Sequence, residues 1–352
     1  MRISPGPGLG FGLGLHGLSA RICPVRRPAQ GALMIIGHMT TTAALTGALR
    51  LTDWGLIRAQ GPDATSFLQG QLTQDVAHLP ADQARLAGYC SAKGRLLASF
   101  VLWRVGAETL LLACSADLLA STLKRLSMFV MRAKCKLTDV SAELALHGLV
   151  GSAAGSVLAD GLGQPAPATP WAMAHLGTGQ LIRLPDADGQ PRWLLAQPAA
   201  AAAPALPALA ADSWQWLEVQ SAVARISLPT VELFVPQMIN LELVGGVNFQ
   251  KGCYPGQEVV ARSQYRGTLK RRAFVFDADT PLTAGQEIFH SADPGQPAGQ
   301  VVLAALRPGG GSSALVETKL AALDNGHLHA GSADGPLLTR TTLPYSIPLD
   351  QG

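Results

Sequence analysis

The chain has little charge and lacks the motifs of several large function classes. Charged residues make up 14% of its 352 residues and the net charge is +3, too small to indicate nucleic-acid binding by itself. It has no run of eighteen apolar residues, so we expect no transmembrane helix. It also has no Gly-x-x-x-x-Gly-Lys-Ser/Thr phosphate loop, no dinucleotide fingerprint in a strand–turn–helix setting and no serine nucleophile elbow. These absences argue against the enzyme classes built on those motifs.

Cysteine is scarce, and its spacing suggests no disulfide framework. The five cysteines include no Cys-x-x-Cys pair, and an odd number in a long chain favours a reducing compartment. Cys90, Cys114 and Cys135 lie in apolar runs, so we expect them to be small buried core residues. Cys253 lies in a polar segment with no histidine or second cysteine at metal-ligand spacing, and we therefore expect no metal site there.

The first 38 residues are rich in glycine, proline and arginine and carry little periodicity. The apolar stretch 9–18 resembles part of a signal peptide, but glycines interrupt it and arginines follow it. We expect residues 1–38 to be a disordered extension or an over-long start, with the ordered protein beginning near Met39.

From residue 49 onward, apolar periodicity predicts a mixture of strands and helices. Strands are expected at 51–59, within 86–114, and at 134–140, 144–150, 181–184 and 192–196. Helices are expected after Asp63, over 116–132 and on a face running from Trp216 to Ile226. The prolines in 151–178 indicate a loop, and the alanine-rich run 199–211 indicates a linker or a weak helix. Paired strands with helices on one face predict an α+β class, followed from about 271 by a small all-β domain.

Residues 248–258 form the most distinctive segment, with one thiol, two glycines, a proline, a lysine and a carboxylate. Glycine and proline so close together predict a defined bend that presents Cys253 and Tyr254. Lys251, two positions before the cysteine, favours its thiolate form. The simpler alternative is a small residue tucked under a turn.

Glu218 lies among tryptophans, in the apolar segment 214–219. A carboxylate is costly to bury there without a partner. One suitable partner is a flat heterocycle with two adjacent N–H donors, such as a pterin, which an aromatic side chain can also stack on. The alternative is a surface glutamate on an exposed helical stripe.

Two further segments carry polar side chains at close spacing. The first is a run of five cations, which is typical either of a phosphate-binding surface or of a solvated strand edge: Arg262, Arg266, Lys270, Arg271 and Arg272. The second is 63–75, where a helix is expected to end in a polar turn; a capped helix end explains it without a function.

Together these segments resemble the YgfZ family of folate-binding proteins, relatives of the glycine-cleavage aminomethyltransferase. The resemblance covers most of 49–348. Its hallmark is Lys251 to Glu258, followed by 259–262 and by Arg266-Gly267. Residues 67–75 and 343–346 support it, whereas 1–38 have no counterpart.

The resemblance implies an aminomethyltransferase-like folate-binding body of ferredoxin-like subdomains in a ring, with a C-terminal β-barrel. The implied domains are the extension 1–38, a folate-binding α+β region at 39–270 and a barrel at 271–352. Within the α+β region it implies two intertwined subdomains, the middle one at about 140–212.

The resemblance also implies a tetrahydrofolate cofactor and a role in iron–sulfur protein assembly or repair, and thereby in tRNA modification. Partners would be the folate and, transiently, iron–sulfur proteins or their assembly machinery, in the cytoplasm. Direct nucleic-acid binding and a membrane partner are not expected. The site residues expected to act are the thiol and its lysine, Cys253 and Lys251, and the cofactor-binding residues Glu218, Tyr254, Gln257, Arg262 and Arg266.

One departure from the enzyme relatives argues against aminomethyl transfer by their mechanism. They carry an acidic pair after a Gly-Gly turn, but here 93–99 place Leu97 and Ala98 about where the pair belongs. Neither side chain can act as an acid or base. Two alternatives to the accessory factor stay open: a one-carbon transferase in which Cys253 replaces the carboxylate, and a tRNA-binding module acting through 262–272.

Overall fold

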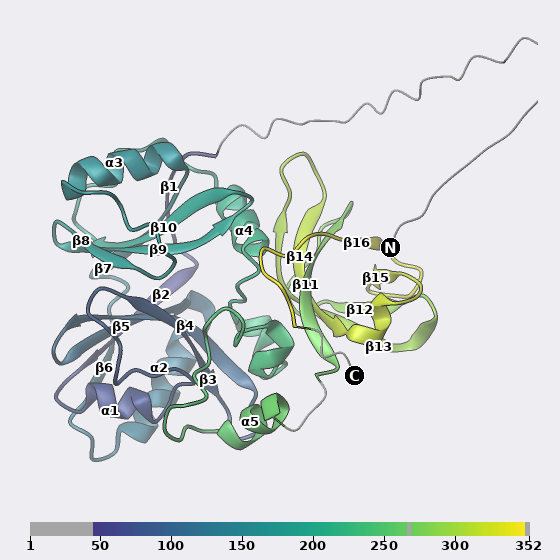
Figure 1. Ribbon diagram of the computed structural model, residues 1–352, viewed down its shortest axis with the longest axis horizontal. Helices are drawn as coiled ribbons and strands as arrows, with labels where there is room; N and C mark the ends of the chain where they lie inside the picture. The colour runs from purple at the N-terminus through teal and green to yellow at the C-terminus, as the bar shows by residue number, and fades with distance from the viewer. Residues whose placement is uncertain (1–44, 266–268, 349–352) are drawn as a thin grey trace, which may run out of the picture. The chain divides into compact units, whose positions relative to one another are not determined.

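The computed structural model describes residues 45–265 and 269–348 (Figure 1). The expected extension 1–38 and the candidate residue Arg266 lie outside the described residues. None of the helices in the described ranges is long and apolar enough to cross a membrane.

One antiparallel sheet of five strands is built from residues 54–139. Its strands, in the spatial order β3-β4-β5-β2-β6, are β2 (Trp54–Gln60), β3 (Ala84–Cys90), β4 (Leu96–Gly106), β5 (Thr109–Ser115) and β6 (Lys136–Asp139). Helix α1 (Ala64–Gln69) follows β2, and helix α2 (Ala116–Val130) joins β5 to β6. Apart from the edge strand β3, this is the β-α-β-β-α-β order of a ferredoxin-like unit. Gly55 lets α2 approach the sheet, because a Cβ there would lie 2.3 Å from Leu119.

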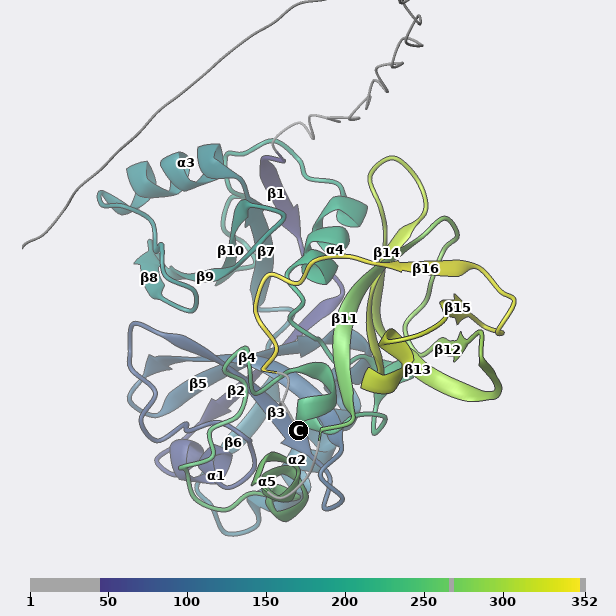
Figure 2. The ribbon, with the colours of Figure 1, turned by 45° about the vertical axis from the view of Figure 1, so that its right-hand side comes forward.

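A second five-stranded sheet is assembled from two separate stretches of chain. Its order is β1-β7-β10-β9-β8, from β1 (Gly47–Arg50), β7 (Leu144–Val150), β8 (Met173–Leu176), β9 (Gly179–Ala187) and β10 (Gln190–Pro198). Helices α3 (Ser152–Leu162) and α4 (Ala211–Gln220) belong to this part. Strand β1 pairs antiparallel with β7, Gly47 opposite Val150 (Figure 1 and Figure 2). The chain therefore starts in this sheet, builds the first sheet, and returns.

The last part of the chain forms a closed barrel, as expected from its short apolar segments. Six strands close in the order β11-β14-β13-β12-β15-β16. They are β11 (Arg271–Ala278), β12 (Glu287–His290), β13 (Asp293–Leu306), β14 (Ser312–Lys319), β15 (Leu328–Ala330) and β16 (Leu337–Arg340). Helix α4 packs on β13 and β14, where Trp216 Nε1 donates a hydrogen bond to Ser313 Oγ at 3.1 Å.

Short helices occupy the connection between the second sheet and the barrel. They are α5 (Gln257–Tyr265) and the 3₁₀ turns Leu228–Thr230 and Pro236–Ile239, with a third 3₁₀ turn at Leu320–Leu323 inside the barrel region. The expected α+β class with a C-terminal barrel is confirmed, whereas the domain boundaries stay predictions.

Two local expectations were wrong. Residues 151–178 are not all loop, because Ser152–Leu162 forms α3 and buries Ala154 and Leu158 one turn apart; the prolines that suggested a loop begin only after its end. The helix expected to reach Ile226 ends at Gln220, since Ala222 adopts a φ of 52°. Cys90 and Cys114 are buried as expected, whereas Cys135 is only partly buried. Burial raises the pKa of the Cys90 and Cys114 thiols to about 12.

Candidate functional site

Glu218 lies in the wall of an aromatic pocket between the two sheets. The residue is only 9% exposed. The pocket encloses about 50 Å³ within a cleft of about 470 Å³ that opens to solvent. Its apolar walls come from both sheets and the segment between them: Trp54, Leu86, Phe100, Val101, Trp171, Leu184, Pro185, Val223 and Ala224. An aromatic slot with one buried acid suits a flat, mainly apolar ring that offers hydrogen-bond donors.

An arginine that the sequence did not single out fixes this carboxylate. Arg225 donates from Nη2 to Glu218 Oε2 at 3.1 Å and to Asp53 Oδ2 at 2.7 Å. Its Cζ lies 4.8 Å from the centre of the Trp54 ring. The arginine therefore ties α4, the start of β2 and the pocket wall into one charged network.

The charge state of Glu218 depends on two opposing effects. Burial raises the pKa of Glu218, and the charge of Asp53 adds to this, while Arg225 and then Arg192 lower it; the net shift is upward. Arg192 lies in the same pocket wall, with its Cζ 5.4 Å from the Trp214 ring. The two arginines therefore oppose the upward pKa shift that burial causes.

The free acceptor atom of Glu218 fits a pterin. Among the described residues, hydrogen bonds to the Glu218 carboxylate reach only Oε2, so Oε1 is free to accept from a ligand. A carboxylate offers about four lone-pair sites, enough for Arg225 and two ligand N–H groups. The enclosed volume is smaller than a pterin ring, so the ring would also occupy the open part of the cleft.

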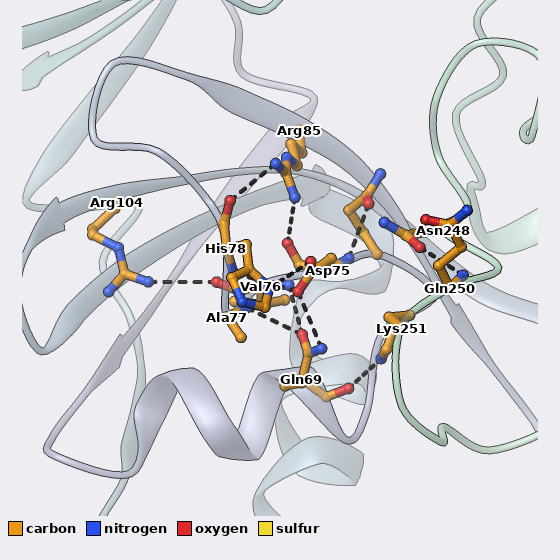
Figure 3. A network of polar contacts seen from close by, with 11 residues as sticks. Gln69, Asp75, Val76, Ala77, His78, Arg85, Arg104, Asn248, Gln250 and Lys251 are labelled. Atoms are coloured by element: carbon orange, nitrogen blue, oxygen red, sulfur yellow. Dashed lines mark hydrogen bonds and ion pairs between the residues drawn. The ribbon is translucent and has the colours of Figure 1, made fainter.

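The hallmark segment is anchored to the early motif at 67–75. Lys251 Nζ donates to the backbone carbonyl of Gln69 (Figure 3) and to that of Leu72, the latter at 2.7 Å. Asn248 N donates to Thr73 O at 2.9 Å, and Thr73 Oγ1 donates to Gly246 O at 2.6 Å. The polar turn after α1 therefore positions the loop that carries Cys253. This is a role beyond the helix capping by which the sequence alone explained the turn.

The early motif holds its own turn with side-chain bonds. Gln69 Oε1 accepts from the backbone of Val76 at 2.6 Å and of Ala77 at 3.1 Å, and Gln69 Nε2 donates to Asp75 (Figure 3). Asp75 Oδ2 lies 2.8 Å from His78 Nδ1. Burial raises the pKa of Asp75, but the bonds with His78 outweigh it and the net shift is downward. Side-chain hydrogen bonds therefore hold together the turn whose carbonyl groups accept from Lys251.

Lys251 itself is largely buried, and burial lowers the pKa of its ammonium to about 8. Its Nζ lies 5.0 Å from the centre of the Tyr254 ring. The charges of Asp75 and then of Cys253 act in the opposite direction on the pKa of Lys251. The hydrogen bonds of Lys251 go to carbonyls. Its effect on the Cys253 thiolate stays a prediction.

The loop exposes Cys253 and buries Tyr254, and burial raises the pKa of the Tyr254 hydroxyl. Gly256 makes this possible: its φ is 79°, and a Cβ there would lie 2.3 Å from Ser91 O and 2.7 Å from Gly94 Cα. The bend expected from glycine and proline therefore packs directly on the 91–94 hairpin.

The expected site residues fall in separate places. Gln257 is partly buried at the start of α5. Arg262 is exposed and lines a different cleft, of about 450 Å³, with Glu258, Ala261 and Tyr265. Glu218 lines its own pocket, whose walls include none of the residues of the hallmark loop or α5.

The cation run is not a continuous surface. Arg271 forms a two-point ion pair with Glu317, one contact at 2.8 Å. Arg272 is buried and pairs with Glu242, while also donating to Gln237 O at 3.0 Å. At least two of the five cations therefore serve the barrel and its junction rather than a ligand.

The position of the enzymes' acidic pair is apolar here. Ala98 is fully buried and Leu97 is half-buried in β4. Ser99, the next residue, lines the Glu218 pocket, and its Oγ accepts a hydrogen bond from Ile226 N at 2.9 Å. Leu97 and Ala98 themselves do not line the pocket.

Two five-stranded sheets followed by a closed barrel define an aminomethyltransferase-like fold. The structure matches glycine cleavage system aminomethyltransferase T from Bartonella henselae with a TM-score of 0.69 over 87% of this chain and 86% of that one. The two are 19% identical, so this likeness concerns the fold. A family model described as the GCVT N-terminal domain matches residues 37–176.

Sequence relatives define the family more narrowly. The chain is 41% identical to tRNA-modifying protein YgfZ of Edwardsiella ictaluri over 239 residues, 64% of this chain and 69% of that protein. It is 30% identical to tRNA-modifying protein YgfZ of Colwellia psychrerythraea over 310 residues, 86% of this chain and 94% of that protein. The chain belongs to the YgfZ family.

Proposed function

We propose that this chain binds a tetrahydrofolate in the Glu218 pocket and acts as an accessory factor for the assembly or repair of iron–sulfur proteins, and thereby for tRNA modification. The observation that carries the proposal is the buried Glu218 carboxylate, with one oxygen held by Arg225 and the other free, at the wall of an aromatic pocket.

The pocket residues have distinct tasks in this proposal. Glu218 accepts two adjacent N–H groups of the pterin, and Arg225 keeps the carboxylate ionised and oriented. Trp54, Phe100 and Trp171 supply apolar and stacking surface. When bound, the folate would supply a one-carbon or reducing function.

The name tRNA-modifying protein, carried by both relatives, supports a role connected with tRNA modification. The exposed Cys253 supports a protein partner, because a thiol at the tip of an anchored loop can reach another protein's surface. We propose that iron–sulfur proteins contact the chain at Cys253 and that Lys251 supports the thiol. We further propose that this interaction takes place in the cytoplasm. Tyr254, Gln257, Arg262 and Arg266 are proposed to assist folate binding only if the ligand extends beyond the Glu218 pocket.

The two alternatives have less support. A one-carbon transferase that uses Cys253 as its acid or nucleophile needs the thiol beside the folate, but Cys253 is not among the residues that line the pocket. A tRNA-binding module needs free cations at 262–272, but Arg271 and Arg272 are engaged in ion pairs. We therefore favour an accessory role over an enzymatic one.

The test is a deletion strain that expresses variants at equal levels. We expect Glu218→Gln and Cys253→Ala each to lower both the activity of iron–sulfur enzymes and the level of tRNA modifications that depend on them. Glu258→Gln, on the exposed face of α5, should behave as wild type. Full restoration by Cys253→Ala would remove the thiol from the proposal, and full restoration by both variants would overturn it.

A further inference from the structure

The end of α2 exposes large apolar side chains that the core does not use. The helix turns Leu119 and Leu126 into the core. Met128 and Phe129, in its last turn, are 61% and 45% exposed, and Met131, directly after it, is 86% exposed. Large apolar side chains gathered on one short stretch of surface mark a contact site more often than single scattered ones.

Basic residues lie close in sequence to these side chains, and Arg125 Cζ lies 5.9 Å from the centre of the Phe129 ring. Five exposed basic residues flank or follow the last turn: Lys124, Arg125, Arg132, Lys134 and Lys136. Within the described residues, none of the five forms a salt bridge. The carboxylates nearby in the fold are otherwise engaged: Asp63 accepts from Lys134 N at 2.7 Å, and Asp139 accepts from Ser141 N at 2.9 Å. We name the three apolar and five basic residues the α2 patch.

The backbone at Met131 gives a third observation. This residue has φ 44° and ψ −102°, a conformation that residues other than glycine rarely adopt. The methionine side chain gains little from packing to offset this conformation, because it is the most exposed of the three. Such unfavourable backbone geometry is concentrated at sites of function.

We propose that the α2 patch is a docking surface for an acidic protein, one that presents an apolar strip bordered by carboxylates. The apolar strip would cover Met128, Phe129 and Met131, and the carboxylates would face the five cations. Flexible methionines are well suited to such an interface, since they adapt to an irregular apolar partner. This proposal does not depend on folate binding.

Two other partners fit the patch less well. A helix that lies in a membrane surface needs a long free apolar face, but the apolar face of α2 is used against the sheet, and only its last turn remains. An RNA would engage the cations through its phosphates, yet it would leave both methionines in water. Only a protein partner uses the apolar and the basic residues together.

The first experiment places a photoreactive amino acid at position 128 of the full-length chain in living cells. A matched control carries it at Leu306, which is 49% exposed on barrel strand β13. We expect a discrete adduct with an acidic protein from position 128 and none from position 306. The adduct should fall at least fivefold when Lys134→Glu and Lys136→Glu are introduced together. The absence of an adduct, an adduct with RNA or lipid, or one that survives the charge reversal would overturn the proposal.

A second variant separates docking from a purely structural role. The protein identified in the adduct is purified and titrated against wild type and Met131→Gly. We expect about tenfold weaker binding, with an unchanged or higher thermal midpoint, because glycine adopts positive φ freely. A lower midpoint with unchanged affinity would show that Met131 serves the fold instead, and would contradict the proposal.

Discussion

Lys251 Nζ lies 2.7 Å from the backbone carbonyl oxygen of Leu72, 179 residues earlier in the chain. This bond, with the one to Gln69 O, joins the two most distinctive motifs of the sequence into one structure. The loop that displays Cys253 is thus held against the turn after α1.

Replacing Lys251 should weaken the attachment of the hallmark loop to the turn after α1. Lys251→Met keeps much of the apolar stem but leaves two carbonyls without their donor, which costs about 2–3 kcal/mol for charge-assisted bonds. Urea unfolding should show the loss as a lower midpoint with an unchanged slope. Lys93→Met, at an exposed position in the adjacent hairpin, is the control and should be neutral. An unchanged midpoint for Lys251→Met would mean that the hydrogen bonds of Lys251 to the two carbonyls contribute nothing to stability.

Lys251 should also make the free energy of unfolding depend on pH. Burial lowers its pKa from 10.5 to about 8 in the folded protein, so between these values the unfolded chain binds more protons and stability rises with pH. The stability that the neutral Lys251 amine contributes is fully present above about pH 10.5 and is lost as pH falls through about 8. The difference in unfolding free energy between wild type and Lys251→Met should therefore grow from pH 7.5 to pH 10. A difference that stays constant over this range would argue against a lowered pKa.

Two glycines in the hallmark loop offer a matched pair. Gly256→Ala places a Cβ 2.3 Å from Ser91 O at a φ of 79°, whereas nothing lies within 4 Å of a Cβ at Gly252. We expect Gly256→Ala to destabilise the protein by about 1–3 kcal/mol and to change the alkylation rate of Cys253. Gly252→Ala should do neither. Equal effects of the two substitutions would contradict the packing of the loop on the 91–94 hairpin.

Arg225 should control the pH dependence of folate binding. The charged groups that act on Glu218 are Arg225, Asp53 and Arg192. Burial already raises the Glu218 pKa, and Arg225→Gln removes the main opposing charge, so this pKa rises further and less carboxylate is ionised at low pH. Tetrahydrofolate affinity of the variant should therefore fall more at pH 6 than at pH 8, by calorimetry or fluorescence under anaerobic conditions.

Arg225→Lys is the control for this prediction, because it keeps the positive charge while losing the planar geometry of the guanidinium. We expect it to restore the wild-type pH profile, though not the full affinity. A parallel loss of affinity at both pH values in Arg225→Gln would show that Arg225 acts by packing against Trp54 and not through the charge of Glu218.

Local chemistry explains which parts of the fold could be predicted. The bend at Gly256, the buried cysteines at 90 and 114 and the helix predicted over 116–132 each depend on residues close in sequence. The structure shows all of them, although the helix ends at Val130. The helix α3 was missed because its short apolar face, Ala154 and Leu158, is weaker than the proline signal that follows it. Tertiary packing on the second sheet determines it instead.

The site depends on contacts that no local pattern encodes. Glu218 could be singled out because a carboxylate among tryptophans is unusual, but its partners Arg225 and Asp53 could not. Arg225 lies beyond the end of α4, and Asp53 precedes β2 by one residue. Likewise, the cations at 262–272 looked equivalent in sequence, and only their distant partners Glu317 and Glu242 distinguish Arg271 and Arg272 from the rest.

The most direct test of the central claim is an anaerobic calorimetric titration of the full-length protein with tetrahydrofolate, comparing wild type, Glu218→Gln and Glu258→Gln. Our account predicts one site per chain in wild type and in Glu258→Gln. In Glu218→Gln we expect affinity lower by at least about tenfold, because the lost charge-assisted bonds are worth more than 1.4 kcal/mol. No heat of binding in wild type, or equal affinity in all three proteins, would contradict a folate site at Glu218.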